Sequence, residues 1–146
     1  MPLTANIEST APASRLGRLL APRSIAFVGG GIAEMAMGRC LEAGFDGEIY
    51  AVHPSRETMS GHHCYPNVDA LPVVPDAAYV GVNRTATIEV VRTLSERGAG
   101  GCVCYAAGFS EVGGDGRALQ EQLVEAAGAM PLVGPNSYGF VNYVDR

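Results

Sequence analysis

Three consecutive glycines, Gly29 to Gly31, lie between a compact apolar run at 24–28 and a stretch with helical spacing of apolar residues. Glycine lets the backbone approach a ligand closely, and the free N–H groups and dipole at a helix start attract negative charge. The turn therefore predicts an anion site, and a phosphate group is the typical ligand of such a turn after a first strand. Tight packing between strand and helix is the alternative interpretation, because it also requires glycine.

The residues around this turn bear on which phosphate ligand it would bind. A dinucleotide fingerprint has a third glycine where this chain has Glu34, and an NAD site has an acidic residue at the end of the second strand. That second place holds the sequence His-Pro-Ser-Arg at 53–56 instead. Arg56 beside Ser55 suits an additional phosphate on the ribose, as in NADP or coenzyme A. The sequence disfavours NAD, and a solvated loop arginine is the alternative interpretation of Arg56.

Four potential metal donors, His53, His62, His63 and Cys64, lie within one loop region. No helix or knuckle spacing presents them together, so we expect no metal site. Nucleophilic catalysis is not indicated either, because Ser137 and the cysteines lack a recognisable elbow sequence. We therefore assign no catalytic residue in this chain.

The elements that position these loops alternate between short apolar runs and segments of helical periodicity. This alternation predicts βαβ units, and near-continuous apolar strands indicate a parallel sheet covered on both faces. A short helix at 14–20, capped by Ser14, precedes the first strand. We expect strands at 24–28, 48–52, 77–82, 101–105 and 130–133, and helices at 32–43, between the cap Thr85 and Gly98, and between Asp115 and Gly128.

These elements predict an α/β fold: a Rossmann-like doubly wound parallel sheet of about five strands in a single domain, with the order 3-2-1-4-5. The stretch after the second strand, to about Pro72, is expected to be a loop. Residues 1–13 are rich in Thr, Ala, Ser and Pro and predict a flexible leader, which leaves 14–146 as the domain. Ligands of such sheets bind outside the carboxyl ends of the strands, so the loops there are the candidate site.

Composition and charge exclude several classes of protein. The 146 residues suffice for one domain, and the net charge of −5 argues against a general nucleic-acid binder. No apolar run approaches the ~20 residues of a membrane helix, and the N-terminus does not resemble a secretion signal. The four cysteines are interpreted as small buried side chains in a reducing compartment, so we expect a cytoplasmic protein with no membrane partner.

Two motifs in the later part of the chain are more specific than the glycine turn. They are AAGFSE at 106–111 and GPNSYG at 134–139, in that order. With these motifs, the stretches 19–30, 44–72, 76–116 and 132–142 resemble the N-terminal CoA-binding domain of NDP-forming acyl-CoA synthetases, relatives of the succinyl-CoA synthetase α subunit. The resemblance covers nearly everything after residue 18.

The resemblance implies that the chain holds CoA for acyl transfer in an acid–thiol ligase. It also implies partners outside this chain, namely a phosphohistidine-type domain and ATP-grasp machinery, as downstream domains or a subunit. Binding of CoA rather than catalysis would be the contribution of these residues. Carried over by position, the residues expected to line the CoA site are Gly29, Gly30, Gly31, His53, Pro54, Ser55, Arg56, Val82, Asn83, Arg84, Ala107, Gly108, Phe109 and Asn136.

The sequence departs from the family pattern at two of these loops. The third loop commonly has a Val-Pro sequence, where this chain has Val82-Asn83-Arg84, and the residue after GPN is often cysteine but is Ser137 here. Two alternatives remain open at this point. One is the NADP-binding domain of an oxidoreductase, and the other is a stand-alone domain that senses CoA or a nucleotide.

Overall fold

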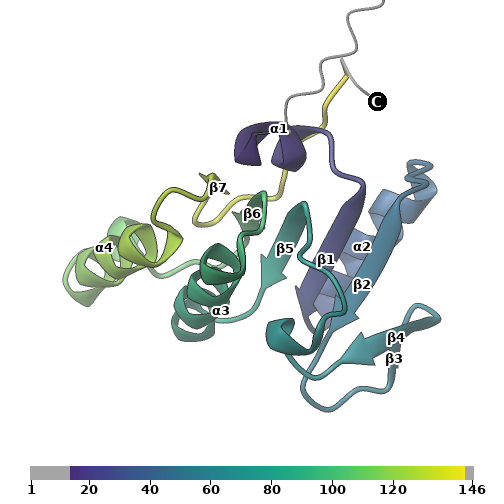
Figure 1. The fold of residues 1–146 in the computed structure, drawn as a ribbon. Coiled ribbons are helices and arrows are strands. Elements are labelled where there is room, and N and C mark those ends of the chain that lie inside the picture. Colours follow the sequence, from purple (N-terminus) through teal and green to yellow (C-terminus); the bar gives the residue numbers. More distant parts are fainter. Residues whose placement is uncertain (1–13, 144–146) are drawn as a thin grey trace, which may run out of the picture.

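The computed structural model describes residues 14–143, which form one α/β domain around a single sheet (Figure 1). The sheet strands within these residues are β1 (Ser24–Gly29), β2 (Glu48–Val52), β3 (Thr58–Met59), β4 (His62–Tyr65), β5 (Ala77–Gly81), β6 (Gly101–Cys104) and β7 (Leu132–Val133). Their order in space is β3-β4-β2-β1-β5-β6-β7, and every neighbouring pair is parallel except β3 with β4. The expected leader at 1–13 lies outside the described residues.

Helices pack on both faces of this sheet, as expected of a doubly wound fold. They are α1 (Arg15–Leu20), α2 (Gly31–Glu42), α3 (Arg84–Arg97) and α4 (Asp115–Ala127), with short 3₁₀ turns η1 (Val68–Ala70) and η2 (Ser110–Val112). Alternate residues of β1 point to opposite faces: Phe27 packs with the α2 residues Ala33 and Met37, whereas Ala26 and Val28 belong to the larger core under α3 and α4. Figure 1 shows α3 and α4 on one side of the sheet and α2 on the other.

The expected strand order needs one correction. The run at 77–81 does not lie beyond β2 but pairs with the opposite edge of β1, through the register Ile25↔Ala77. The place beyond β2 is taken by β4, in a stretch that was expected to be a loop, through Ala51↔Cys64. With β4 counted as the third parallel strand, the order is the 3-2-1-4-5-6 of the Rossmann fold. β4 is short, and Cys64 is its only buried residue, so the sequence has no apolar run there that would predict a strand.

Most helix ends lie at or within one residue of the expected boundaries, and the start of α3 differs most. Ser14 Oγ accepts the N–H of Gly17 and caps α1, and Gly98 ends α3 with a left-handed φ of 84°. The cap of α3 is Asn83 rather than Thr85, because the Asn83 side chain accepts the N–H of Ala86 at 2.9 Å. Asn and Thr both favour the N-cap position, and the cap lies two residues earlier than expected, at Asn83 instead of Thr85.

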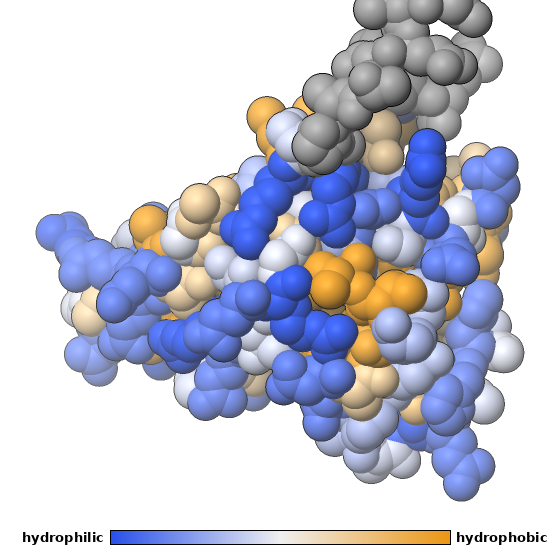
Figure 2. All heavy atoms as spheres, viewed as in Figure 1, coloured by the Kyte–Doolittle hydropathy of each residue, from blue (hydrophilic) through white to orange (hydrophobic). Residues whose placement is uncertain are grey.

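The surface differs between the two sides of the sheet. Figure 2 shows the α3 and α4 side, where hydrophilic side chains dominate and a smaller hydrophobic patch lies to the right of the centre. On the α2 side, an apolar groove of about 1260 Å³ runs between α2 and the C-terminal residues 138–143, over Tyr79 and Tyr105. The Tyr105 and Tyr138 rings meet edge to face at 5.5 Å. No helix within residues 14–143 has the length and apolar character to cross a membrane.

Candidate functional site

Five loops lie at the carboxyl edge of the sheet. They follow β1, β2, β5, β6 and β7, which all run in the same direction because each neighbouring pair among them is parallel. The residues expected to bind CoA lie in these loops or at the adjoining ends of strands and helices, since Gly29 ends β1, Gly31 begins α2 and Arg84 begins α3. Their side chains have different surroundings, however, and the first two loops alone bring several donors to one point.

The three glycines of the first loop have different roles. Gly29 has a φ of 130°, and a Cβ there would lie 2.3 Å from the carbonyl oxygen of Gly81, so this glycine lets β1 and β5 approach. Gly30 is the N-cap residue of α2, and a Cβ there would lie 3.9 Å from His53 Nε2 and 4.0 Å from Arg56 Nη2. A Cβ on Gly31 would meet nothing within 4 Å. The space above Gly30 and Gly31 is thus open and faces two nitrogen atoms.

The turn at 53–56 orients the His53 ring. Its Nδ1 accepts the backbone N–H groups of Ser55 and Arg56, each at 3.2 Å. An imidazole nitrogen that accepts hydrogen bonds carries no proton, so in the neutral ring the proton is on Nε2. Nε2 is the atom that faces Gly30, and it is therefore a donor directed at the first loop. Pro54 and Ser55 form the turn that makes this arrangement possible.

Arg56 is held by a partner that the sequence did not reveal. Its Nη1 donates to Glu34 Oε2 at 2.8 Å, while Glu34 Oε1 accepts from the backbone N–H of Ser60 at 3.2 Å and from its hydroxyl at 3.3 Å. The Arg56 hydrogen bond, followed by that of the Ser60 N–H, lowers the pKa of Glu34 below its ordinary value. The carboxylate is thus ionised at neutral pH. In the sequence, Glu34 was notable only because it occupies the third glycine position of the dinucleotide fingerprint.

The third loop mainly stabilises its own surroundings. The Asn83 side chain caps α3, and Val82 packs against the larger core. Arg84 Nη1 donates to the carbonyl oxygen of Gly108 at 2.8 Å, which joins the third and fourth loops. These residues lie at the expected edge of the sheet, but their main contacts are within the protein.

The fourth loop contains a buried side chain and an internal carboxylate. Phe109 is 0% exposed and belongs to the larger core, so its ring does not face the edge where a ligand would bind. The Glu111 carboxylate accepts the N–H groups of Gly108 at 2.6 Å and Phe109 at 3.1 Å. Its own backbone N–H, followed by that of Gly108, lowers the pKa of Glu111. Two N–H groups of this loop are therefore already bound to Glu111, while Ala107 is exposed.

The fifth loop contacts the end of β6. A Cβ on Gly134 would lie 2.7 Å from the carbonyl oxygen of Cys104, and the N–H of Ser137 donates to that same oxygen at 2.9 Å. Asn136 is exposed and has a left-handed φ of 57°. Ser137 Oγ accepts the N–H of Gly139 at 3.2 Å, a local turn contact rather than a contact to a base.

Metal coordination has no support in the described part of the chain. Among residues 14–143, no three His, Cys, Asp or Glu side chains come together as possible ligands. His63 instead contacts Tyr65 edge to face, with ring centroids 5.0 Å apart. The donors of the first two loops, in contrast, are N–H groups and a guanidinium, which suit an anion.

The chain matches one protein family over most of its described residues. Residues 23–143 match the family model described as the CoA binding domain. The chain is 38% identical over 139 residues to trans-feruloyl-CoA synthase FCS1 from an unknown prokaryotic organism, covering 90% of this chain and 20% of that protein. It is 33% identical over 130 residues to ADP-forming acetate–CoA ligase I of Archaeoglobus fulgidus, covering 86% and 19%.

The solved structures agree with these relatives. The dinucleotide forming acetyl-coenzyme A synthetase 1 of Ca. Korarchaeum cryptofilum, in its apo form, superposes with a TM-score of 0.77 at 32% identity. The match covers 83% of this chain and 28% of that one. The chain thus spans about a fifth of the length of the two curated relatives.

Proposed function

Because the chain belongs to the CoA binding domain family, we propose that it binds coenzyme A at the carboxyl edge of its sheet and holds it for acyl transfer. The parent activity that we propose is that of an NDP-forming acyl-CoA synthetase, an acid–thiol ligase. The phosphohistidine-type and ATP-grasp domains of such a ligase would lie in other parts of the protein or in another subunit. The similarity to two CoA ligases and to an acetyl-coenzyme A synthetase supports this proposal.

The observation that carries the proposal is the convergence of donors over Gly30. The His53 Nε2 and Arg56 Nη2 atoms lie 3.9 and 4.0 Å from the position of a Cβ on Gly30, at the start of α2. A helix start with free N–H groups, an imidazole N–H donor and a guanidinium form a cradle for a phosphate group. A nucleotide-like ligand with phosphates is therefore the class that this edge accepts.

Within that activity, the residues of this chain would bind and orient CoA rather than react with it. The first two loops would hold phosphate through backbone N–H groups, His53 and Arg56. Fixing the nucleotide end limits where the thiol can move, which raises its effective concentration at a neighbouring active site. No residue of the described chain is placed as a nucleophile, acid or base in this function.

The location that we propose is the cytoplasm. The four cysteines are free thiols, which agrees with a reducing compartment. The partners that we propose are CoA and the remaining ligase domains, with no nucleic acid and no membrane.

The test is a set of binding measurements with a variant that fills the cradle. Gly30→Ala places a methyl group in van der Waals contact with the two nitrogen atoms and clashes with nothing, so the fold should persist. We expect about a tenfold or greater loss of CoA affinity by calorimetry, the equivalent of one lost charge-assisted hydrogen bond. Gly38→Ala is the matched control, because it adds a methyl group to the same helix with nothing within 4 Å.

Two outcomes would overturn the proposal. One is tight binding of NADPH with no CoA signal, which would favour an NADP-binding domain. The other is an unchanged CoA affinity in Gly30→Ala, which would place the ligand elsewhere. Arg56→Ala adds a further reading: CoA affinity should fall more than dephospho-CoA affinity, because the guanidinium is assigned to the ribose phosphate.

A further inference from the structure

We infer that Glu34 is a positioning residue of this site, whose carboxylate holds the Arg56 guanidinium over the first glycine loop. Selectivity for a ligand with a ribose phosphate then depends on the Glu34–Arg56 pair and not on Arg56 alone. The inference rests on the proposed function, in which Arg56 binds a phosphate of CoA. It assigns a role to a side chain that would not touch the ligand.

The pair joins two elements that are separate in the sequence. Glu34 lies in the first turn of α2, and Arg56 lies 22 residues later in the loop after β2. One carboxylate oxygen accepts from Arg56 Nη1 and the other from the N–H and hydroxyl of Ser60. Because both oxygens are held, the carboxylate has a defined orientation, and it imposes one on the guanidinium.

The orientation imposed on Arg56 is the one that a phosphate ligand needs. The Nη1 group is occupied by Glu34, whereas Nη2 lies on the side of Gly30, at 4.0 Å from its Cβ position. Arginine has many rotamers, and a free side chain would lose that freedom on binding a ligand. The ion pair removes much of this freedom in the unliganded protein, so less is lost when the phosphate arrives.

The Glu34 carboxylate also repels the ligand phosphate, and this repulsion weakens binding, whereas the positioning of Arg56 strengthens it. The Arg56 and Glu34 side chains are 40% and 37% exposed, so solvent screens charge interactions at this place. Screening weakens repulsion over the longer distance more than it weakens the direct hydrogen bond between the pair. We therefore expect the positioning effect to exceed the repulsion.

The experiment is a double-mutant cycle measured with two ligands. CoA and dephospho-CoA are titrated by calorimetry into the wild-type chain, Glu34→Ala, Arg56→Ala and the double variant. We expect Glu34→Ala to weaken CoA about three- to tenfold and to change dephospho-CoA less than about twofold. In the Arg56→Ala background, Glu34→Ala should cause no further loss of affinity for either ligand, because the guanidinium that Glu34 positions is absent. Glu34→Gln, which keeps an acceptor oxygen, should retain most of the wild-type preference for CoA.

A control variant separates positioning from a general effect on α2. Glu42→Ala removes a comparable surface ion pair, Arg39–Glu42 at 2.8 Å, from the same helix and should leave both affinities unchanged. Tighter CoA binding by Glu34→Ala, equal losses for both ligands, or additive losses in the double variant would overturn the inference. If Arg56→Ala discriminates between the ligands and Glu34→Ala does not, the inference alone fails. If the wild-type chain binds no CoA, the proposed function itself fails.

Discussion

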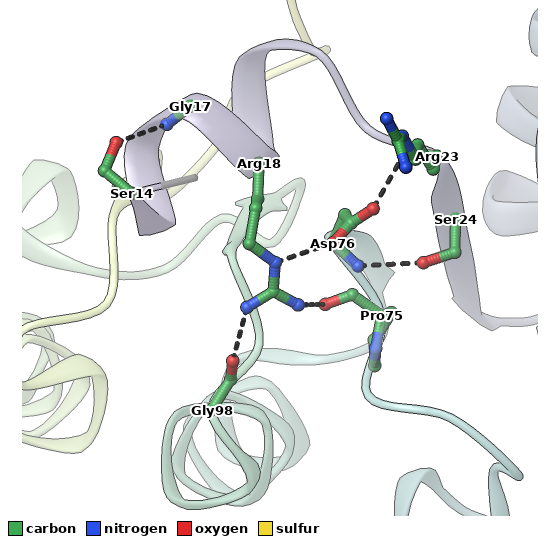
Figure 3. Close-up of polar contacts among 8 residues, drawn as sticks. All are labelled: Ser14, Gly17, Arg18, Arg23, Ser24, Pro75, Asp76 and Gly98. Atoms are coloured by element: carbon green, nitrogen blue, oxygen red, sulfur yellow. Dashed lines mark hydrogen bonds and ion pairs between the residues drawn. The ribbon is translucent and has the colours of Figure 1, made fainter. Parts of the chain in front are cut away.

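The Arg18 guanidinium and the Asp76 carboxylate form a 2.6 Å ion pair that joins α1 to the residue before β5. The same carboxylate accepts the N–H of Arg23, and the Asp76 N–H donates to Ser24 Oγ (Figure 3). Arg18 also donates to the carbonyl oxygen of Gly98. One acidic residue therefore connects α1, β1 and β5 at the edge of the sheet opposite the candidate site.

Replacing Asp76 should destabilise the domain without affecting the ligand edge. Asp76→Asn keeps the shape but weakens two hydrogen bonds to a side chain that is only 18% exposed. We expect the free energy of unfolding in urea to fall by about 1–3 kcal/mol. Asp46→Asn, at an exposed position, is the control and should change it by less than about 0.5 kcal/mol.

The same residue should make stability depend on pH at acid values. Partial burial acts to raise the pKa of Asp76, but the hydrogen bonds from Arg18 and Arg23 outweigh it and hold the pKa below its ordinary value of 3.8. A carboxyl whose pKa is lowered by folding stabilises the protein above its unfolded value, and this contribution is lost as pH falls through the folded value. Urea unfolding between pH 2 and pH 5 should show a smaller pH slope in Asp76→Asn, and equal slopes would contradict the assignment.

Gly29 and Gly31 should differ sharply in their tolerance of alanine. Gly29→Ala places a Cβ 2.3 Å from the Gly81 carbonyl oxygen in a backbone with a φ of 130°, and we expect a loss of about 2–5 kcal/mol in stability. Gly31→Ala adds a methyl group in open space at the start of α2 and should stay within about 1 kcal/mol of the wild type. Thermal and urea unfolding measure both. Similar stabilities of the two variants would contradict the close approach of β1 and β5.

The cysteines should react with a thiol reagent in an order set by burial. Cys64, Cys102 and Cys104 are 5% exposed or less, and Cys40 is half-buried beside the apolar groove. The hydrogen bond with Cys104, followed by burial, raises the pKa of Cys102, and burial raises that of Cys40. At pH 8 we expect at most one slow reaction in the native protein and four in guanidinium. Cys40→Ala should abolish the native reaction, and rapid labelling of two or more thiols would contradict the buried positions.

Glu111 should protect two backbone amides of the fourth loop from hydrogen exchange. Its carboxylate accepts the N–H groups of Gly108 and Phe109, so Glu111→Ala should raise the exchange rates of both. The pKa of Glu111 is lowered from its ordinary value of 4.5, so in the wild type the protection should persist at neutral pH and decline only at pH values below that ordinary value. Glu121→Ala, at an exposed position of α4, is the control. Unchanged exchange at Gly108 and Phe109 would show that the carboxylate does not hold the loop.

Most elements of the fold follow from local sequence. The run EIYAV at 48–52 became a strand with those bounds, and Gly98 ended α3 in the left-handed conformation that glycine favours. The hairpin of β3 and β4 was missed because its strands are short and polar. They are stabilised by the pairing of β4 with β2 and of β3 with β4 rather than by their own apolar pattern. The strand order was wrong for the same reason, since an unrecognised β4 took the place assigned to residues 77–81.

In the candidate site too, some features could be predicted from the sequence and others could not. Residue type and position indicated Arg56 and the glycines as candidates, with a solvated loop arginine and tight strand–helix packing as the alternative interpretations, and their role in binding stays a prediction. Whether Phe109 faced the ligand edge was not recognisable from its motif, and its ring is fully buried. The partner of Arg56 depends on a contact between the loop after β2 and the start of α2. The orientation of the His53 ring, in contrast, is set by backbone N–H groups within its own turn.

The amino-acid sequence by itself determined the class of fold, the glycine turn and the residue types available to bind a phosphate. These depend on periodicity and on backbone preferences that act over a few residues. The tertiary structure alone decided that Glu34 holds Arg56 above Gly30, because that contact needs α2 and the loop after β2 to be packed together. The physical reason is that an ion pair between residues 22 positions apart has no local pattern, and only the folded chain brings the two charges within 2.8 Å.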